Sequence, residues 1–409
     1  VMLPTVKYKS DLKEYKAVQD GSNKVWNIPA EGSQAISLNE LLQYTLLHHP
    51  ELKYYAWDVE GKDALVLQSR KISNPELETE LENAGIDAFS ISIGQLIELG
   101  GKRSSRIALA KLDKNASVWE YEIKRLQLLI ETGQEFILTL KSQQMIELLT
   151  ESIEYAKTSY QEAQKRKNVG AASQIDILQT QKDQELVSLE RDKELNRYHA
   201  QLQLLAAYAG DTQASFSHVL GELEKPSNIP ELTDLISRIN LSPEITAWMI
   251  RAESYQIIEK KVKAQNIPDI SVNAGYAREN SSGNNTFLLG FSLPLPLFDR
   301  NKGNITEANI NNYRALFERE ALELSLYNDL LINYTEFENT FNEIQVYSEN
   351  ILPLANKTYN EAKMFYSAGK MSSLELLSYQ RELLENEIYY INLLADFYLG
   401  KYTLELLIG

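Results

Sequence analysis

The sequence contains no cysteine, few glycines and prolines, and no long apolar run. Without cysteine, the chain can form no disulfide, no thiolate metal site and no cysteine nucleophile. The 18 glycines and 11 prolines among 409 residues are too few for a disordered chain. Because no stretch of about 18 apolar residues exists, we expect no transmembrane helix. No signal-peptide pattern opens the sequence, so we expect a cytosolic protein or the mature form of an exported one.

The sequence also has fewer basic than acidic residues. Its 57 Asp and Glu outnumber its 41 Lys and Arg and give a net charge of −16. Nucleic acid favours clustered Lys and Arg, so we expect no nucleic-acid partner. An acidic surface or channel attracts cations instead.

Chemical motifs are missing as well. The sequence shows no nucleophile triad, phosphate-binding loop or dinucleotide motif, so we expect neither an enzyme nor a cofactor. Of the four histidines, His48 and His49 are the candidate metal ligands. Adjacent side chains on a helix point apart, however, and we therefore expect no metal site.

The chain repeats itself after about half its length. Around "SIGQLIELGGKRSSRIALAK", which begins at Ser92, Phe89 corresponds to Phe287, 198 residues later. Further on, "YQEAQKRKNVGAASQIDILQTQ" from Tyr160 matches "YNEAKMFYSAGKMSSLELLSYQ" from Tyr359, 199 residues later. One residue is therefore inserted between these two blocks in the second copy. We interpret the sequence as two tandem copies of one unit.

This interpretation divides the chain into an N-terminal extended segment (1–36), a first copy (37–210), a linker (211–230) and a second copy (231–409). Each copy is predicted to contain short helices, two strands and a long helical hairpin. The first long helix has no proline over roughly 65 residues, which corresponds to about 100 Å. The second is interrupted at Pro353, where we expect a kink. Heptad spacing predicts coiled-coil packing between these helices.

Four short segments alternate apolar and polar residues, a pattern typical of strands. They are 76–83, 87–97, 268–277 and 286–296. The polar side of the first is a glutamate row: Glu76, Glu78, Glu80 and Glu82. Membrane strands show this pattern with the apolar side outward, and so do soluble amphipathic sheets. At this point both interpretations remain open.

Two kinds of junction connect these elements. Gly100 and Gly101 end the strands of the first copy, and Pro294 and Pro296 end those of the second. We expect the hairpin turns at 168–174 and 367–373. Each turn contains a glycine followed by a capping box, which is a serine with an acid three residues later. The residues concerned are Gly170, Ser173 and Asp176 in the first copy, and Gly369, Ser372 and Glu375 in the second.

Taken together, the repeat, "NPELETELEN", "ELGGKR", "LPLPLFDRNKG" and the paired hairpin turns resemble the TolC family of outer-membrane efflux channels. The two corner motifs are most similar to its Czc-type heavy-metal cation exporters. The resemblance covers nearly the whole chain from about residue 37.

The resemblance implies an α+β membrane protein in the outer membrane of a Gram-negative bacterium. Three chains would form a homotrimer, with their helical hairpins as an α-barrel tunnel across the periplasm. Four strands from each chain would close a twelve-stranded β-barrel in the lipid. The implied function is a passive exit duct for substrates such as heavy-metal cations. The implied partners are a periplasmic adaptor and an inner-membrane, proton-driven pump of the RND type.

The same resemblance implies roles for individual residues. It places Asp176, Glu375 and Tyr366 at a pore constriction at the periplasmic tip, although capping alone would also explain the two acids. The TolC archetype has a basic residue and a further acid at positions that are Met371 and Ser378 here. The glutamate row and Asp269 would line the barrel lumen, or would otherwise belong to a solvated sheet face.

A soluble periplasmic coiled-coil scaffold without channel activity is the alternative to a channel. The four strand segments discriminate between the two, because a scaffold needs no apolar band facing outward.

Overall fold

A computed structural model describes residues 35–82, 87–280 and 282–409. These residues fall into two compact units. The hairpin unit comprises the described residues up to Lys53, Lys124–Ser242 and Ser325–Gly409, and the sheet unit comprises Tyr54–Ile123 and Pro243–Leu324. Each unit therefore takes residues from both expected copies. Of the expected N-terminal segment, only strand β1 (Ala35–Ile36) lies within the described residues.

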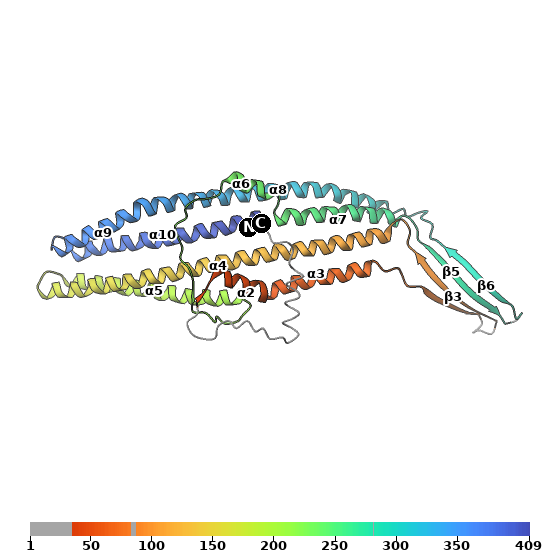
Figure 1. Cartoon of the computed structure of the whole chain (residues 1–409), viewed down its shortest axis with the longest axis horizontal. Coiled ribbons are helices and arrows are strands. Elements are labelled where there is room, and N and C mark those ends of the chain that lie inside the picture. The colour runs from red at the N-terminus through yellow and green to blue at the C-terminus, as the bar shows by residue number, and fades with distance from the viewer. Residues whose placement is uncertain (1–34, 83–86, 281) are drawn as a thin grey trace. The chain divides into compact units, whose positions relative to one another are not determined.

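Two long helical hairpins dominate the hairpin unit (Figure 1). The first consists of α4 (Lys102–Asn168), which begins in the sheet unit, and α5 (Gln174–Tyr208). The second pairs α9 (Leu352–Ser367) with α10 (Ser373–Ile408). The turns between them lie within the ranges expected from the sequence.

Heptad-spaced residues bury the seams between these helices. Met145 and Leu149 of α4 pack against Val187 of α5, and partly buried side chains of α10 complete the cluster: Leu384, Ile388 and Ile391. Full burial of one such side chain contributes about 1.5–3 kcal/mol. The apolar seams thus hold the two hairpins together as one packed unit.

The helix before α9 is interrupted, as Pro353 predicts. Helix α8 (Lys302–Val346) is followed by a π-helical segment, Tyr347–Ile351, and Pro353 lies in the first turn of α9. In that position, proline removes an N–H that has no partner within the new helix. The interruption therefore takes the form of a wide helical turn directly before the proline.

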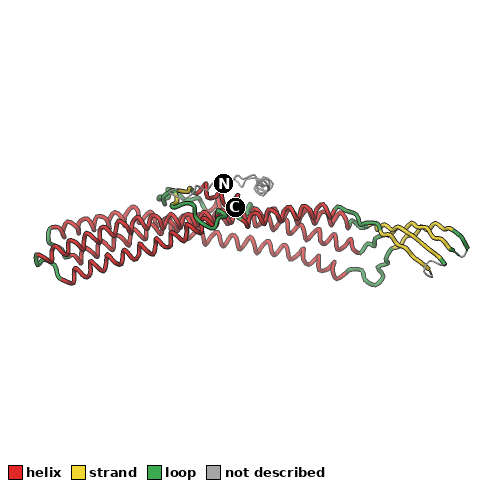
Figure 2. The backbone as a smooth tube through the Cα atoms, turned by 90° about the horizontal axis from the view of Figure 1, so that it is seen from below, coloured by secondary structure: helices red, strands yellow, loops and turns green. Residues whose placement is uncertain are grey.

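Shorter elements complete the described chain (Figure 2). Helices α3 (Pro50–Ser69) and α7 (Pro243–Gln265) both start at proline, where the preset φ suits a first turn. Helices α2 (Leu38–His48) and α6 (Leu232–Ile239) precede them. Strand β1 pairs in parallel with β4 (His218–Val219). Among the described helices, none combines the length and the apolar character needed to span a bilayer.

The sheet unit contains a four-stranded antiparallel sheet in the order β2-β3-β5-β6. Its strands are β2 (Glu76–Glu82), β3 (Ala88–Ile97), β5 (Ile270–Glu279) and β6 (Asn285–Ser292). The two central strands, β3 and β5, come from different copies of the sequence. Strand β6 ends before Pro294 rather than at 296, because proline has no N–H for the ladder. Strand β5 begins at Ile270, two residues later than expected.

The strand register separates apolar from polar side chains. One row across the sheet is Thr79, Ile91, Tyr276 and Phe287, and a neighbouring row on the opposite face begins with Glu78 and Ser92. Because the side-chain period of a strand is two, the same register also places Gln95 and Arg278 on the side of Phe287, and Leu96 and Leu288 on the side of Ser92. We call the two sides the apolar face (Leu77, Leu81, Ile91, Ile93, Phe287, Leu289, Phe291) and the polar face (Glu76, Glu78, Glu80, Glu82, Ser90, Ser92, Asn273).

Candidate functional site

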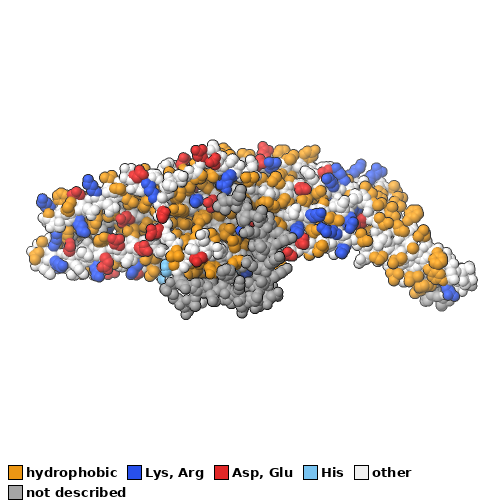
Figure 3. Space-filling view, in the orientation of Figure 1, with side chains coloured by type: hydrophobic (Ala, Val, Ile, Leu, Met, Phe, Trp, Pro, Cys, Tyr) orange, Lys and Arg blue, Asp and Glu red, His pale blue; other side chains and the backbone are white. Residues whose placement is uncertain are grey.

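The apolar face of the sheet is exposed rather than packed in a core. Phe287, Leu289 and Phe291 are 88%, 84% and 78% exposed. Figure 3 shows hydrophobic side chains gathered over the strands. A contiguous exposed apolar surface of this kind marks an interaction with lipid or with another protein.

The glutamate row lies on the polar face, as the alternation predicts. All seven residues of β2 are exposed, and each glutamate stands opposite a small residue of β3: Gly94, Ser92, Ser90 and Ala88. Asp269 does not belong to this row, because it precedes β5. The structure therefore brings the four glutamates together and places Asp269 at the corner between sheet and helix.

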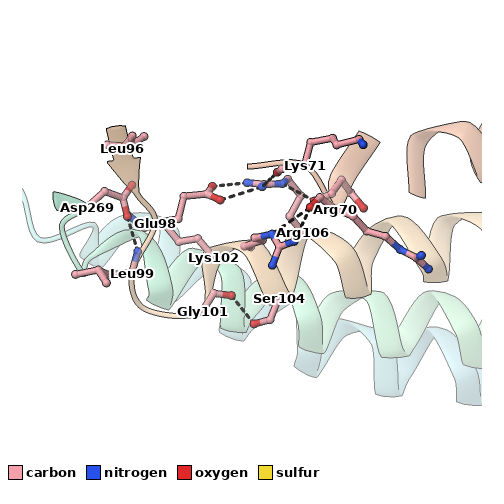
Figure 4. A network of polar contacts seen from close by, with 12 residues as sticks. Arg70, Lys71, Leu96, Glu98, Leu99, Gly101, Lys102, Ser104, Arg106 and Asp269 are labelled. Carbon is pink, nitrogen blue, oxygen red and sulfur yellow. Dashed lines mark hydrogen bonds and ion pairs between the residues drawn. The ribbon is translucent and has the colours of Figure 1, made fainter. Parts of the chain in front are cut away.

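Asp269 takes part in a polar network at the first strand-to-helix corner (Figure 4). Its carboxylate lies 2.8 Å from the Lys102 ammonium and accepts the Leu99 N–H at 2.9 Å. Burial raises the pKa of Asp269, but Lys102 and the Leu99 N–H outweigh that effect and leave the pKa lowered. The network thus joins the start of α4 to the start of β5.

Glu98 and Arg106 form the second part of this network. The two side chains make a bidentate ion pair, and the hydrogen bond from Arg106 lowers the pKa of Glu98. The Arg103 guanidinium donates to the Arg70 carbonyl oxygen at 2.6 Å, just beyond the end of α3. Arg106 also donates to the carbonyl of Ser69, the last residue of α3. Cations at the C-terminal end of a helix complement its dipole.

At the hairpin tips, Asp176 and Glu375 complete capping boxes. Asp176 donates its backbone N–H to the Ser173 hydroxyl at 3.2 Å, and its carboxylate accepts the Ser173 N–H at 2.7 Å. Ser372 and Glu375 repeat this arrangement at 3.2 and 2.9 Å. The hydrogen bonds from the backbone and side chain of Ser372 lower the pKa of Glu375. Both carboxylates therefore stabilise helix starts, while Glu375 remains exposed and Asp176 partly exposed.

The two tip glycines adopt left-handed backbone conformations. The φ angles of Gly170 and Gly369 are +76° and +72°, and a Cβ at either position would meet no atom within 4 Å. These glycines are needed for the backbone conformation alone, since the surrounding space is open.

Tyr366 is buried at the second tip and contacts an arginine from the first. It packs with Ala362, Leu376 and the partly buried Met371. The Arg166 guanidinium lies 3.7 Å above the Tyr366 ring and donates to the Tyr366 carbonyl oxygen at 2.6 Å. Met371 thus packs as an apolar side chain, and the cation that contacts Tyr366 is Arg166 of α4.

Arg166 was not singled out from the sequence, where it lies within the basic run "KRKN". Its equivalent in the second copy is Phe365, and that difference between the copies was the available signal. A second pair also links the hairpins, because Arg381 of α10 binds the buried carboxylate of Asp183 of α5. Arg381 follows Leu377 along α10 at heptad spacing, so the pair lies in the apolar seam.

His48 and His49 are partly buried at the end of α2, and burial lowers the pKa of both. The His49 ring stacks on Tyr208. Among the residues that the structure describes, no three His, Asp or Glu side chains are grouped as metal ligands.

Comparison with protein families gives two matches along the chain. A family model described as "Outer membrane efflux protein" matches residues 41–211 and 240–409. The chain belongs to the outer membrane efflux protein family. As a member, it is an efflux protein of the outer membrane. This membership favours the channel over the soluble scaffold.

Relatives of this outer membrane efflux protein include a metal resistance protein. The cobalt-zinc-cadmium resistance protein CzcC of Cupriavidus metallidurans is 26% identical over 95% of this chain and 94% of its own. Among solved structures, CusC has a TM-score of 0.77 at 14% identity and covers 94% of this chain and 96% of its own. VceC of Vibrio cholerae has a TM-score of 0.75 at 18% identity, with coverages of 91% and 96%. These similarities show that the fold is TolC-like.

Proposed function

We propose that three copies of this chain form a passive exit duct whose twelve strands close into one barrel in the outer membrane. The observation that carries this proposal is the exposed apolar face, with Phe287, Leu289 and Phe291 pointing away from any core. In the order β2-β3-β5-β6, the outer strands β2 and β6 each have one unpaired edge within this sheet. Unpaired backbone groups are costly in lipid, and closure by neighbouring chains would satisfy them.

Two adjacent residues of β6 allow a direct test. Phe291 is on the apolar face, and Ser292 pairs with Ser271 on the polar face. Phe291→Asp should impair membrane assembly, because it places a charged side chain in hydrocarbon. At the bilayer midplane this costs about 2–4 kcal/mol for a basic residue and less for an acid. The matched Ser292→Asp variant should assemble normally. Equal behaviour of the two variants, or a wild-type protein that is a stable monomer in detergent-free buffer, would contradict the proposal.

The proposed cargo is heavy-metal cations, delivered by a proton-driven RND-type pump through a periplasmic adaptor. The similarity to CzcC over nearly the whole of both chains supports this assignment. The exposed glutamate row gives the polar face the negative charge that a cation pathway favours. In this proposal the chain is neither an enzyme nor a carrier of a cofactor.

The proposed constriction is formed by the hairpin tips, where three chains would bring together six carboxylates from Asp176 and Glu375. Such a ring would attract cations and repel anions. Tyr366 and the tip residues Gly170, Ser173, Gly369 and Ser372 would hold it in position. The capping hydrogen bonds are compatible with this role, since Glu375 is exposed and Asp176 is partly exposed.

The test is conductance of the reconstituted trimer in planar bilayers. Asp176→Asn with Glu375→Gln keeps an oxygen acceptor for each cap but removes the charge. We expect cation selectivity and block by divalent ions to weaken while trimers still form. The matched control neutralises Glu76 and Glu78 on the sheet. If the control loses selectivity and the tip variant keeps it, the glutamate row is the filter.

A further inference from the structure

Cations are concentrated at the strand-to-helix corners of a chain whose net charge is −16. Five exposed basic residues lie within three positions of a helix end there, and we call them the basic collar: Arg70, Lys71, Arg103, Arg300 and Lys302. Figure 3 shows Lys and Arg side chains gathered where the helices of the sheet unit meet the strands.

The acids of the same corners do not neutralise the collar. Glu98 is paired with Arg106, and Asp269 with Lys102. Asp299 caps the backbone N–H of Asn301 at 2.9 Å. Within the part of the chain that the structure describes, no residue of the collar forms an ion pair with these acids. The collar therefore presents a net positive charge to its surroundings.

The other end of the sheet has the opposite character. Its described charged residues are Glu82, Asp87 and Glu279, with Arg278 as the cation. Exposed Lys and Arg thus outnumber unpaired acids at the end where the helices begin, whereas acids outnumber the single Arg278 at the other end. Solubility alone does not require charges of opposite sign at the two ends of the sheet.

Apolar side chains accompany the collar. Leu295, Leu297 and Phe298 lie within five residues of Arg300 and are 68%, 63% and 101% exposed. They continue the exposed apolar residues of β6 beyond its end at Ser292. A surface that combines exposed apolar groups with Lys and Arg fits the boundary between acyl chains and headgroups of a bilayer.

We propose that the basic collar binds the phosphate groups of anionic phospholipids, with Phe298 inserted beside them. The inference rests on the proposed function, in which the apolar face contacts lipid. Guanidinium groups bind phosphate oxygens in pairs, and ammonium groups bind them as point charges. An acidic protein would satisfy the charges, but it would not explain the exposed Leu295, Leu297 and Phe298. The collar would thereby fix the depth of the sheet in the leaflet next to the helices.

The experiment compares phosphatidylglycerol with phosphatidylcholine as ligands of the purified full-length trimer in detergent. The melting temperature of the wild-type protein is followed while each lipid is added. We expect stabilisation by phosphatidylglycerol at lower concentration than by phosphatidylcholine, and we expect high salt to remove the difference.

Two quadruple variants serve as a matched pair. The collar variant (Arg70→Gln, Lys71→Gln, Arg300→Gln, Lys302→Gln) spares Arg103, which caps α3, and should lose apparent phosphatidylglycerol affinity at least about tenfold. The control variant (Lys182→Gln, Lys193→Gln, Lys357→Gln, Lys370→Gln) removes as many exposed charges from the hairpins and should behave like the wild type. A charge-preserving collar variant, with Arg and Lys exchanged, should retain the preference if the glutamine variant fails to fold.

Different outcomes separate this inference from the proposed function. If the wild type forms trimers that insert into vesicles but does not prefer phosphatidylglycerol, the collar has no lipid role and the duct stands. Equal lipid preference in the collar and control variants also overturns the inference and leaves an acidic protein as the partner. If the wild type does not enter bilayers at all, the proposed duct itself is wrong.

Discussion

The two strand-to-helix corners hold equivalent positions in the sequence but rest on different interactions. In the first, Gly100 has a φ of +68°, and a Cβ there would lie 2.9 Å from the Ile267 side chain and 3.0 Å from the Ala264 carbonyl oxygen. The chain therefore turns in a space too small for any side chain. The surrounding ion pairs, Glu98 with Arg106 and Lys102 with Asp269, close this corner.

The second corner is open and relies on hydrogen bonds made by Asn301. Asn301 takes the left-handed conformation at φ +54°, and its amide donates to the Val262 carbonyl oxygen at 3.0 Å. Pro294 and Pro296 keep the preceding segment out of the ladder, and the Leu295 and Leu297 side chains remain exposed. A strand-to-helix corner can thus be specified either by close packing or by the hydrogen bonds of one left-handed residue, and only the second solution leaves apolar side chains available to a partner.

The largest effect expected from this comparison belongs to Gly100→Ala. The substitution adds a left-handed non-glycine residue and a clash with Ile267, so it should destabilise the protein by about 3 kcal/mol or more. Thermal unfolding followed by circular dichroism in detergent measures this. Gly170→Ala is the matched control, because its φ is similar but its surroundings are open. Equal losses in the two variants would mean that close packing at Gly100 is irrelevant.

At the open corner, Asn301→Ala should cost about 2 kcal/mol, through lost hydrogen bonds and backbone strain. Asn301→Gly removes the strain but not the lost hydrogen bonds, and should recover about half of that loss. The same unfolding assay separates the two contributions. No recovery in the glycine variant would assign the whole effect to the side-chain amide.

The ion pairs of the first corner predict a dependence on pH. The pKa of Glu98 is lowered from its ordinary value of 4.5, so its stabilising effect is complete above 4.5 and is lost as pH falls through the lower folded value. Glu98→Gln should cost about 1 kcal/mol at neutral pH and should reduce the acid sensitivity of unfolding. A variant with the wild-type pH profile would show that Glu98 does not contribute.

The smallest effects are expected at the hairpin tips, where the two copies use the same chemistry. Ser173→Ala and Ser372→Ala should each cost about 1 kcal/mol, because each removes one N-cap acceptor. Similar losses at the two tips, measured by chemical denaturation, would agree with their matching capping boxes. A much larger loss at Ser372 would indicate that the second tip has a further structural role near Tyr366.

Features set by local spacing were accessible from the sequence. The alternation of apolar and polar residues predicted the four strands and their faces, because the period of a strand fixes which side each residue takes. The capping boxes at Ser173 and Ser372 were also predicted, since all their atoms lie within four consecutive residues. Pro353 indicated the interruption of the helix.

Features set by distant partners were not accessible. The partners of Asp269 are one example, because its carboxylate is held by Lys102 and Leu99, about 170 residues away in the sequence. Only the pairing of β3 with β5 brings these residues together. Arg166 was missed for the same reason, since its partner Tyr366 lies on the other hairpin. A local sequence pattern indicates which face of a helix or strand a residue lies on, but not which distant helix or strand packs against that face.

The π-helical segment Tyr347–Ile351 also explains how two copies of unequal length keep the same order of faces. The second copy has one residue more than the first between the corner and the tip, as the change in offset from 198 to 199 shows. In a regular α-helix, one added residue would rotate everything after it by about 100°. A π-helical turn accommodates the added residue within a single turn. Side chains beyond it, from Tyr359 to the tip, therefore keep the orientation that a chain without the insertion would give them.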